Sequence, residues 1–158
     1  LLATIARETT RLQLGFAILP LPIHDPVRVA ERLTTLNIIS GGRVLWGVGR
    51  GVTITELEAF GVEPEDSCKV FKERLAELRD ILESGRYRRG SQTHDLNPPP
   101  ALRLRHGWMA AVSPESFDLA ATLELDVLTG PFKPWPMIKV DLKRYRRLRP
   151  DGISVDIL

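Results

Sequence analysis

Two short segments of the sequence carry residue types that could bind an anion. In residues 47–51 (GVGRG), Arg50 follows an apolar stretch and stands between glycines. In residues 113–116 (SPES), two serines enclose a proline and a glutamate where a helix would begin. A guanidinium matches a phosphate in shape and charge, and the free N–H groups at a helix N-terminus attract one. The first chemistry to consider is therefore phosphate binding by Arg50, Ser113 and Ser116.

The glycine spacing argues against one familiar phosphate-binding turn. A dinucleotide-binding turn has the pattern G-x-G-x-x-G and opens a helix directly. Here the pattern is G-x-G-x-G, and residues 52–55 (VTIT) are all β-branched, a poor start for a helix. The glycines alone indicate a tight turn. Arg50 favours a ligand site, because ligands bind beyond the C-terminal ends of parallel strands. We expect Gly49 and its neighbours to leave room for a cofactor.

Residues 113–116 have a second interpretation, in which they only cap a helix. Ser113 would then be the N-cap, Pro114 the first helical residue and Ser116 the third. Glu115 suits the positive end of the helix dipole, but it would repel a phosphate unless it points away. Both interpretations remain open on these residues alone.

Strand-like and helical segments alternate along the chain. The apolar stretches predict strands at 12–19, 44–48, 107–112, 126–129 and 153–158, and helical spacing follows at 27–38, 53–60, 64–83, 113–124 and 137–148. Such alternation predicts parallel βα units, either in a doubly wound open sheet or in part of a (β/α)₈ barrel. Residues 86–106 are basic and proline-rich without periodicity, so we expect an irregular excursion there.

The composition excludes several classes of function. The chain has 158 residues, is 43% hydrophobic and carries a formal net charge of +2, which gives no field to attract nucleic acid or an anionic membrane. No apolar run reaches the ~20 residues of a membrane span. The single cysteine rules out an internal disulfide, and the three histidines lack metal-ligand spacing. We therefore expect no metal, nucleic-acid or membrane partner, and a cytoplasmic location.

Both ends of the chain leave apolar residues uncovered. Residues 1–6 read as the middle of a helix, and residues 153–158 read as a strand with nothing after it. An unprotected apolar strand is unusual at the end of a natural domain. We expect residues 1–158 to form a single incomplete domain, a piece of a longer protein.

Several motifs occur in a fixed order: HDPVRVAE at 24–31, SGGR at 40–43, GVGRG at 47–51, ELEAFGV at 56–62, and a strand–loop–helix–strand pattern at 107–132. This ordered set resembles the luciferase-like flavin-dependent monooxygenase family. Two features depart from the family pattern. Asp25 stands where relatives usually have histidine, and the usual aromatic-rich strand pair is hard to see within 86–105.

The resemblance implies an α/β fold, a partial (β/α)₈ TIM barrel comprising about strands 3 to 7 of eight, with parallel strands alternating with helices. It also implies a flavin or deazaflavin at the C-terminal face. Arg50 matches an arginine that binds the cofactor phosphate, residues 113–116 match the phosphate loop, and a non-proline cis peptide is expected at Ala17–Ile18, against the flavin ring. The cofactor-binding residues implied are Ala17, Ile18, Gly49, Arg50, Ser113, Pro114 and Ser116.

By the same resemblance, the expected function is a flavin-dependent monooxygenase that acts on a small organic substrate. Reduced FMN, supplied by a flavin reductase, and O₂ would be its co-substrates, and a homodimer is common in the family. An F420-dependent oxidoreductase on the same scaffold is the alternative, and a non-catalytic or degraded flavin-binding relative is a third. No catalytic residue is assigned, because the resemblance places the family's catalytic side chains on strands that precede Leu1.

Overall fold

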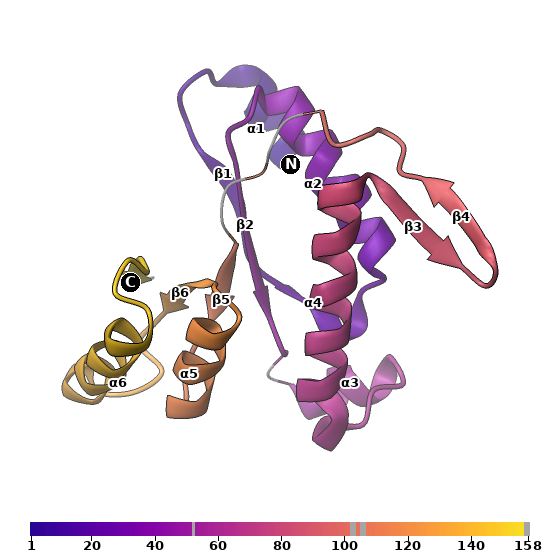
Figure 1. Cartoon of the computed structure of the whole chain (residues 1–158). Coiled ribbons are helices and arrows are strands. Elements are labelled where there is room, and N and C mark those ends of the chain that lie inside the picture. The colour runs from indigo at the N-terminus through magenta and orange to yellow at the C-terminus, as the bar shows by residue number, and fades with distance from the viewer. Residues whose placement is uncertain (52, 102–103, 105–106, 157–158) are drawn as a thin grey trace.

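The apolar stretches form a five-stranded parallel sheet in the computed structural model, which describes every residue except 52, 102–103, 105–106 and 157–158. The strand order is β1–β2–β5–β6–β7, and every neighbouring pair is parallel (Figure 1). The strands are β1 (Leu14–Pro20), β2 (Val44–Gly49), β5 (Trp108–Ala110), β6 (Asp126–Thr129) and β7 (Ser154–Asp156). This sheet confirms the predicted parallel βα units. Its order follows the chain without reversal, as in a barrel and unlike a doubly wound sheet.

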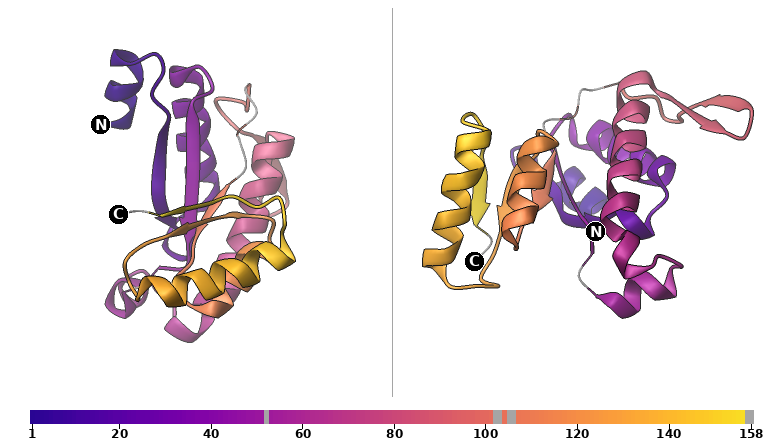
Figure 2. Two further views of the ribbon diagram at one scale, coloured as in Figure 1. Left: turned by 90° about the vertical axis from the view of Figure 1, so that its left-hand side faces the viewer. Right: turned by 60° about the horizontal axis from the view of Figure 1, so that its bottom comes forward.

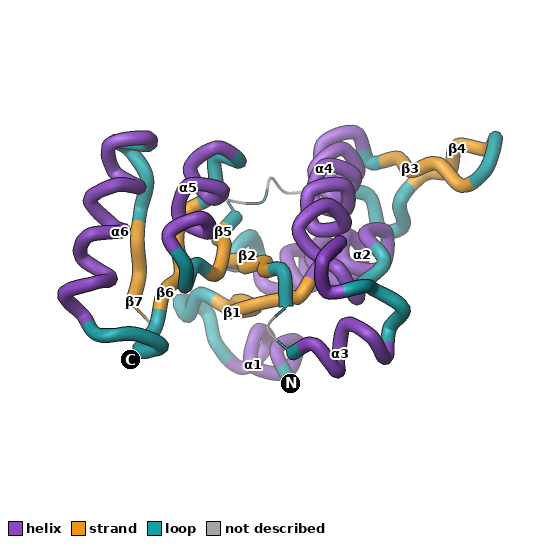
Figure 3. The backbone as a smooth tube through the Cα atoms, turned by 90° about the horizontal axis from the view of Figure 1, so that it is seen from below, coloured by secondary structure: helices purple, strands orange, loops and turns teal. Residues whose placement is uncertain are grey.

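Helices connect the strands, and α4, α5 and α6 lie along one face of the sheet (Figure 3). The α-helices are α1 (Leu2–Glu8), α2 (Pro26–Ser40), α3 (Ile54–Ala59), α4 (Ser67–Ser84), α5 (Pro114–Thr122) and α6 (Trp135–Leu148), with 3-10 turns η1 (Leu21–Ile23) and η2 (Pro64–Asp66). Asp25 caps α2, because its carboxylate accepts the Val27 N–H at 2.8 Å. The helix ends at Gly41, whose φ of 67° is a conformation that glycine adopts without strain.

The core lies between the sheet and this helix layer. Side chains alternate along β2, and Val44, Trp46 and Val48 are all buried. The helices contribute large apolar side chains that are fully buried, among them Leu33, Phe71, Leu75, Leu78, Phe117 and Tyr145. The Tyr145 hydroxyl donates to the Leu125 carbonyl at 2.9 Å, so this polar atom is satisfied within the core. A packed helix-side core of this kind holds the strand ends, and the loops beyond them, in place.

The segment 86–106 differs from its prediction. It opens with an antiparallel hairpin of β3 (Arg86–Arg89) and β4 (Gln92–Asp95), which projects from the body beyond α4 (Figure 2). The expectation of an irregular excursion is therefore wrong for residues 86–95. Most of these side chains are exposed on both faces, so no period-two pattern marks the strands. Positions 102–103 and 105–106, also covered by that expectation, lie outside the described residues.

The hairpin is fixed to the helices by a few side-chain contacts. The rings of Tyr87 and His94 stack across the two strands with centroids 5.4 Å apart. Arg89 forms ion pairs with Asp25, ahead of α2, at 2.9 Å and with Glu77 of α4 at 2.7 Å. Because Asp25 also caps α2, the hairpin and the start of that helix share one carboxylate. Asp25 thus has a structural role in this chain.

Candidate functional site

The two segments expected to bind phosphate follow neighbouring strands of the sheet. Arg50 comes directly after β2, and residues 113–116 come after β5. These strands pair in parallel, with Val48 beside Met109, so their C-terminal ends lie at the same edge. In Figure 1, β1 and β2 both run away from α1 towards α3, which places this edge at the α3 end of the sheet. The fold therefore brings together two segments that are far apart in the sequence.

Side-chain contacts connect these segments directly. Arg50 Nη2 donates to Ser116 Oγ at 3.2 Å, and Ser116 Oγ lies 3.0 Å from Ser113 Oγ. Ser116 is buried, whereas Arg50 and Ser113 are half-buried. Among the described residues Arg50 makes no ion pair, so most of its five N–H donors remain available. We call Arg50, Ser113 and Ser116 the phosphate cluster.

The start of α5 is built differently from a simple cap. Ser113 occupies the N-cap position and Pro114 the first helical position, as predicted. The Ser113 side chain, however, makes no capping hydrogen bond, and its hydroxyl lies against Ser116 instead. The Ser113 carbonyl accepts the N–H groups of Ser116 at 2.9 Å and Phe117 at 3.3 Å. Capping alone therefore does not account for the two hydroxyls.

Glu115 stands between the two serines of the phosphate cluster in the sequence. Its side chain is exposed, and its pKa is held below the ordinary value of 4.5. The main cause is its own backbone N–H, which donates to the carboxylate, followed by the Ser113 hydroxyl and then the charges of Arg144 and Arg50. The Glu115 carboxylate therefore stays ionised at neutral pH.

The glycines of β2 allow β1 to approach closely, and the expectation that they leave room for a cofactor stays a prediction. A Cβ added at Gly47 would lie 2.5 Å from the Phe16 carbonyl oxygen. A Cβ added at Gly49 would lie 2.6 Å from Cδ1 of Ile18. The expected cis peptide between Ala17 and Ile18 is confirmed. Ile18 therefore fills the space beside Gly49, at the strand end that leads to Arg50.

Two charged residues near this strand edge, Lys133 and Arg144, belong to none of the motifs recognised in the sequence. Lys133, in the loop after β6, forms an ion pair with Asp141 of α6, and its ammonium lies 5.5 Å from the Phe117 ring centroid. Both members of the pair are largely buried, so Lys133 serves packing between α5 and α6. Arg144 of α6 pairs with Asp118 of α5. The only sequence signals for them were that Lys133 follows a strand and that Arg144 lies on a neighbouring helix.

His24, in the loop after β1, belongs to a different environment. Burial lowers its pKa, Arg32 and Arg74 lower it further, and Glu56 opposes them. Its backbone carbonyl accepts a hydrogen bond from Arg74 at 2.7 Å. The imidazole is therefore neutral at physiological pH, because its ordinary pKa of 6.5 is already below that range.

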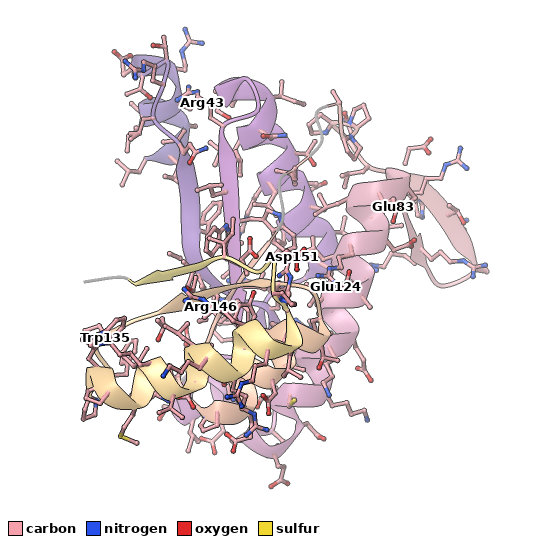
Figure 4. The ribbon with its side chains drawn as sticks, turned by 60° about the vertical axis from the view of Figure 1, so that its left-hand side comes forward. Arg43, Glu83, Glu124, Trp135, Arg146 and Asp151 are labelled. Carbon is pink, nitrogen blue, oxygen red and sulfur yellow. The ribbon has the colours of Figure 1, made fainter. Side chains whose placement is uncertain are left out.

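A cavity of about 440 Å³ lies elsewhere, between α6 and the adjoining strands. Its lining comes from the end of β6, one face of α6 and the start of β7: Thr129, Trp135, Lys139, Leu142, Lys143, Arg146 and Ser154. Figure 4 shows Trp135 and Arg146 on this helix. No member of the phosphate cluster lines it, so the cavity is separate from the candidate site. Within the described part of the chain, no acid, histidine and cysteine side chains gather as a metal site would require, and no helix is both long and apolar enough to cross a membrane.

Comparison with known proteins agrees with the fold and the order of the motifs. The model of the family described as luciferase-like monooxygenase matches residues 1–156, so the chain belongs to that family. Over 148 residues it is 31% identical to 4-hydroxyprotoasukamycin monooxygenase of Streptomyces nodosus subsp. asukaensis, which covers 89% of this chain and 40% of that protein. Over 80 residues it is 38% identical to F420-dependent glucose-6-phosphate dehydrogenase of Amycolatopsis mediterranei (strain U-32), which covers 49% of this chain and 22% of that protein.

A solved structure shares the fold. It is the oxygenating constituent of 3,6-diketocamphane monooxygenase from Pseudomonas putida, in complex with FMN, with a TM-score of 0.79 and 16% sequence identity. The match covers 98% of this chain and 48% of that chain. The chain therefore spans about half the length of this relative, or less for the curated ones, and has the α/β fold of that half.

Proposed function

We propose that this chain carries the cofactor-phosphate grip of a luciferase-like flavin-dependent monooxygenase, which oxidises a small organic substrate with O₂ and reduced FMN. One observation carries the proposal: Arg50 and Ser116 meet at 3.2 Å beyond the C-terminal ends of two adjacent parallel strands. Ligands of parallel α/β folds bind at this edge. Membership of the family supports the same assignment.

The residues present fit the phosphate of such a cofactor. Arg50 offers a planar set of donors, and the hydroxyls of Ser116 and Ser113 stand next to it. Arg50 would bind the phosphate through charge-assisted hydrogen bonds, and the two serines would fix its orientation. Ile18, beside Gly49, would give the ring system an apolar contact at the end of β1. When bound, reduced flavin supplies the electrons that activate O₂.

F420 is the second candidate cofactor, because one relative that matches at 38% identity is F420-dependent. The phosphate cluster serves either cofactor. In the FMN-dependent form a flavin reductase would supply the reduced cofactor, the protein would act in the cytoplasm, and it would assemble as a homodimer. Gly49 and Pro114 remain part of the proposed binding surface through their positions next to Ile18 and Ser113.

Cofactor titration with an arginine variant tests the proposal. We expect Arg50→Ala to raise the Kd for FMN about 10- to 100-fold, since a hydrogen bond to a charged group contributes about 1.5–3 kcal/mol. Flavin fluorescence during titration measures the Kd, and F420 is titrated in parallel. Arg88→Ala is the matched control, because Arg88 is an exposed arginine on the hairpin. Equal FMN affinity in Arg50→Ala and wild type would show that the phosphate assignment is wrong. Failure of wild type to bind either cofactor would reject the function.

A further inference from the structure

The cavity of about 440 Å³ beside α6, here called the α6 cavity, is built from three elements of the fold. Thr129 stands at the C-terminal end of β6, Ser154 begins β7, and the other lining residues belong to α6. Because β6 and β7 pair in parallel, one wall of the cavity is sheet and the other is helix. Small-molecule sites have volumes of about 300–1,000 Å³. The α6 cavity is therefore large enough to hold a ligand of its own.

Three cations line the α6 cavity, and no acid does. Lys139, Lys143 and Arg146 follow one another at helical spacing, so they share one face of α6. Among the side chains that the structure describes, none of the three forms an ion pair. The acids that contact α6 and its C-cap are used by other cations, in the pairs Lys133–Asp141, Arg144–Asp118 and Arg149–Asp126. The charge on this face is therefore not neutralised by those acids.

Two printed contacts distinguish the α6 cavity from an ordinary solvated basic face. Arg146 Nη2 donates to Ser154 Oγ at 3.2 Å, which holds the guanidinium against the first residue of β7. Towards the other end of the helix, the Lys139 ammonium lies 5.7 Å from the Trp135 ring centroid. Figure 4 shows Trp135 at the start of α6 and Arg146 further along it. The cations therefore stand in one hollow together with an indole ring and a strand hydroxyl.

Trp135 gives the cavity an aromatic wall. Its exposed fraction is 45%, although a tryptophan is usually well buried. An exposed indole can stack against a flat ring of a ligand while neighbouring cations pair with the ligand's acidic groups. At 1.5 Å per residue, Trp135 and Arg146 lie about 16 Å apart along the helix. This length accommodates a ring and charged groups side by side.

We propose that the α6 cavity is a second ligand site, separate from the phosphate cluster, and that it binds an aromatic organic anion with two negative charges. The ring rests on Trp135 and Leu142. One acidic group pairs with Lys143 and Arg146, and the other pairs with Lys139. Two negative charges offset most of the three positive charges on this face, whereas a neutral ligand leaves all three uncompensated. This site goes beyond the proposed function and does not depend on it.

Calorimetric titration of the whole chain with three related probes tests the class of ligand. Naphthalene-2,6-dicarboxylate has the ring and two charges, 2-naphthoate has the ring and one charge, and 2-naphthol is neutral at neutral pH. We expect the affinity to fall about fivefold at each step, because each lost charge removes one partly exposed ion pair. Equal affinity for the dicarboxylate and 2-naphthol would overturn the proposal.

Substitutions on α6 test the location of the site. We expect the double variant Lys143→Gln with Arg146→Gln to raise the Kd for the dicarboxylate about 25-fold, and Trp135→Leu to raise it about fivefold. Arg147→Gln is the matched control, because Arg147 is an exposed arginine of the same helix that does not line the cavity, and its Kd should equal that of wild type. Thermal unfolding confirms that each variant is folded. Unchanged affinity in the double variant would show that the cavity is not the site.

Arg50→Ala separates this inference from the proposed function. We expect this variant to bind the dicarboxylate as tightly as wild type, since Arg50 does not line the α6 cavity. If Arg50→Ala lost the dicarboxylate and the double variant on α6 kept it, the probe would be bound by the phosphate cluster and the present inference would be rejected. If wild type did not bind the dicarboxylate at all, the second site would be rejected as well, and the FMN titration of the phosphate cluster would be unaffected.

Discussion

The two ends of β2 carry the same residue type in opposite situations. Arg43 precedes the strand, at the end that adjoins α1, and Arg50 follows it (Figure 4 labels Arg43). The Arg43 guanidinium donates to five acceptors within 3.1 Å: Ser40 O, Leu12 O, Thr9 Oγ1, Ala6 O and Thr9 O. Arg50 donates to one acceptor among the described residues, Ser116 Oγ.

The difference shows how to separate a structural arginine from a ligand-binding one. All the acceptors of Arg43 come from the last residue of α2, from α1 and from the loop that leads into β1, so it joins three segments at the N-terminal edge of the sheet. Its donors are used up, and nothing remains for a ligand. Arg50 stands at the C-terminal edge with donors to spare, and it makes no ion pair with the described residues. Satisfaction of donors therefore distinguishes the two more clearly than sequence context does.

Replacement of Arg43 should have the largest effect on stability. Arg43→Ala removes a charged donor from four carbonyls and a hydroxyl, and we expect the free energy of unfolding to fall by about 3 kcal/mol. Arg50→Ala should change it by less than about 0.5 kcal/mol, because it loses a single hydrogen bond from a half-buried side chain. Urea unfolding measures both. Similar losses in the two variants would remove the contrast between the ends of β2.

The glycines of β2 offer a finer comparison within the same strand. Gly47→Ala places a methyl 2.5 Å from the rigid Phe16 carbonyl oxygen, so we expect a loss of about 1–3 kcal/mol as β1 and β2 are forced apart. Gly49→Ala meets the movable Cδ1 of Ile18 and should cost less. It should instead change flavin binding, because Ile18 must shift at the site. Unfolding and FMN titration of both variants check this, and a larger stability loss for Gly49→Ala would contradict it.

Local sequence signals were sufficient to predict most of the helices and strands of the parallel sheet. The apolar run at 44–48 lies within the observed β2 (Val44–Gly49), and the helix predicted at 27–38 lies within the observed α2 (Pro26–Ser40). Each of these depends on residues that are adjacent in the chain. The hairpin at 86–95 was missed because most of its side chains are exposed on both faces, so no period-two pattern marks its strands. The start of α6 was also set too late, since its observed first residue is Trp135.

The candidate site, like the fold, was only partly predictable from the sequence. The proximity of Arg50 to residues 113–116 could be expected, because parallel βα units place the ends of their strands at one edge. The role of Ser113 could not, since its hydroxyl has two local options, the backbone cap or the Ser116 side chain. Sequence therefore locates the phosphate cluster, whereas the hydrogen-bond partners of its side chains require the structure.

Asp25 extends the comparison to an acid. It lies near the C-terminal end of a strand, but its carboxylate oxygens already have hydrogen-bond and ion-pair partners within the protein. It accepts the N–H groups of Val27 and Arg28 and an ion pair from Arg89. Burial raises its pKa, but the Arg28 and Val27 N–H groups and the Arg89 charge outweigh this, so its pKa lies below the ordinary 3.8. A carboxyl with a depressed pKa stabilises the fold above its unfolded-state pKa, and this contribution is lost as pH falls through the folded-state value.

Asp25→Asn keeps a capping oxygen and removes the charge, so the expected effect is small. We expect a loss of about 0.5 kcal/mol at pH 7, because the pair with Arg89 is half-exposed and screened by water. The difference from wild type should shrink as pH falls from the unfolded-state value of about 3.8 and vanish below the folded-state pKa, where Asp25 is neutral in both states. Asp95→Asn is the control, because its pair with Arg86 is more exposed and should contribute almost nothing. Urea unfolding across this pH range measures both variants. A difference that grew towards low pH would mean that burial raises the folded-state pKa of Asp25. Asp25 would then resemble Arg50, as a charged residue whose partner is not supplied by the protein itself.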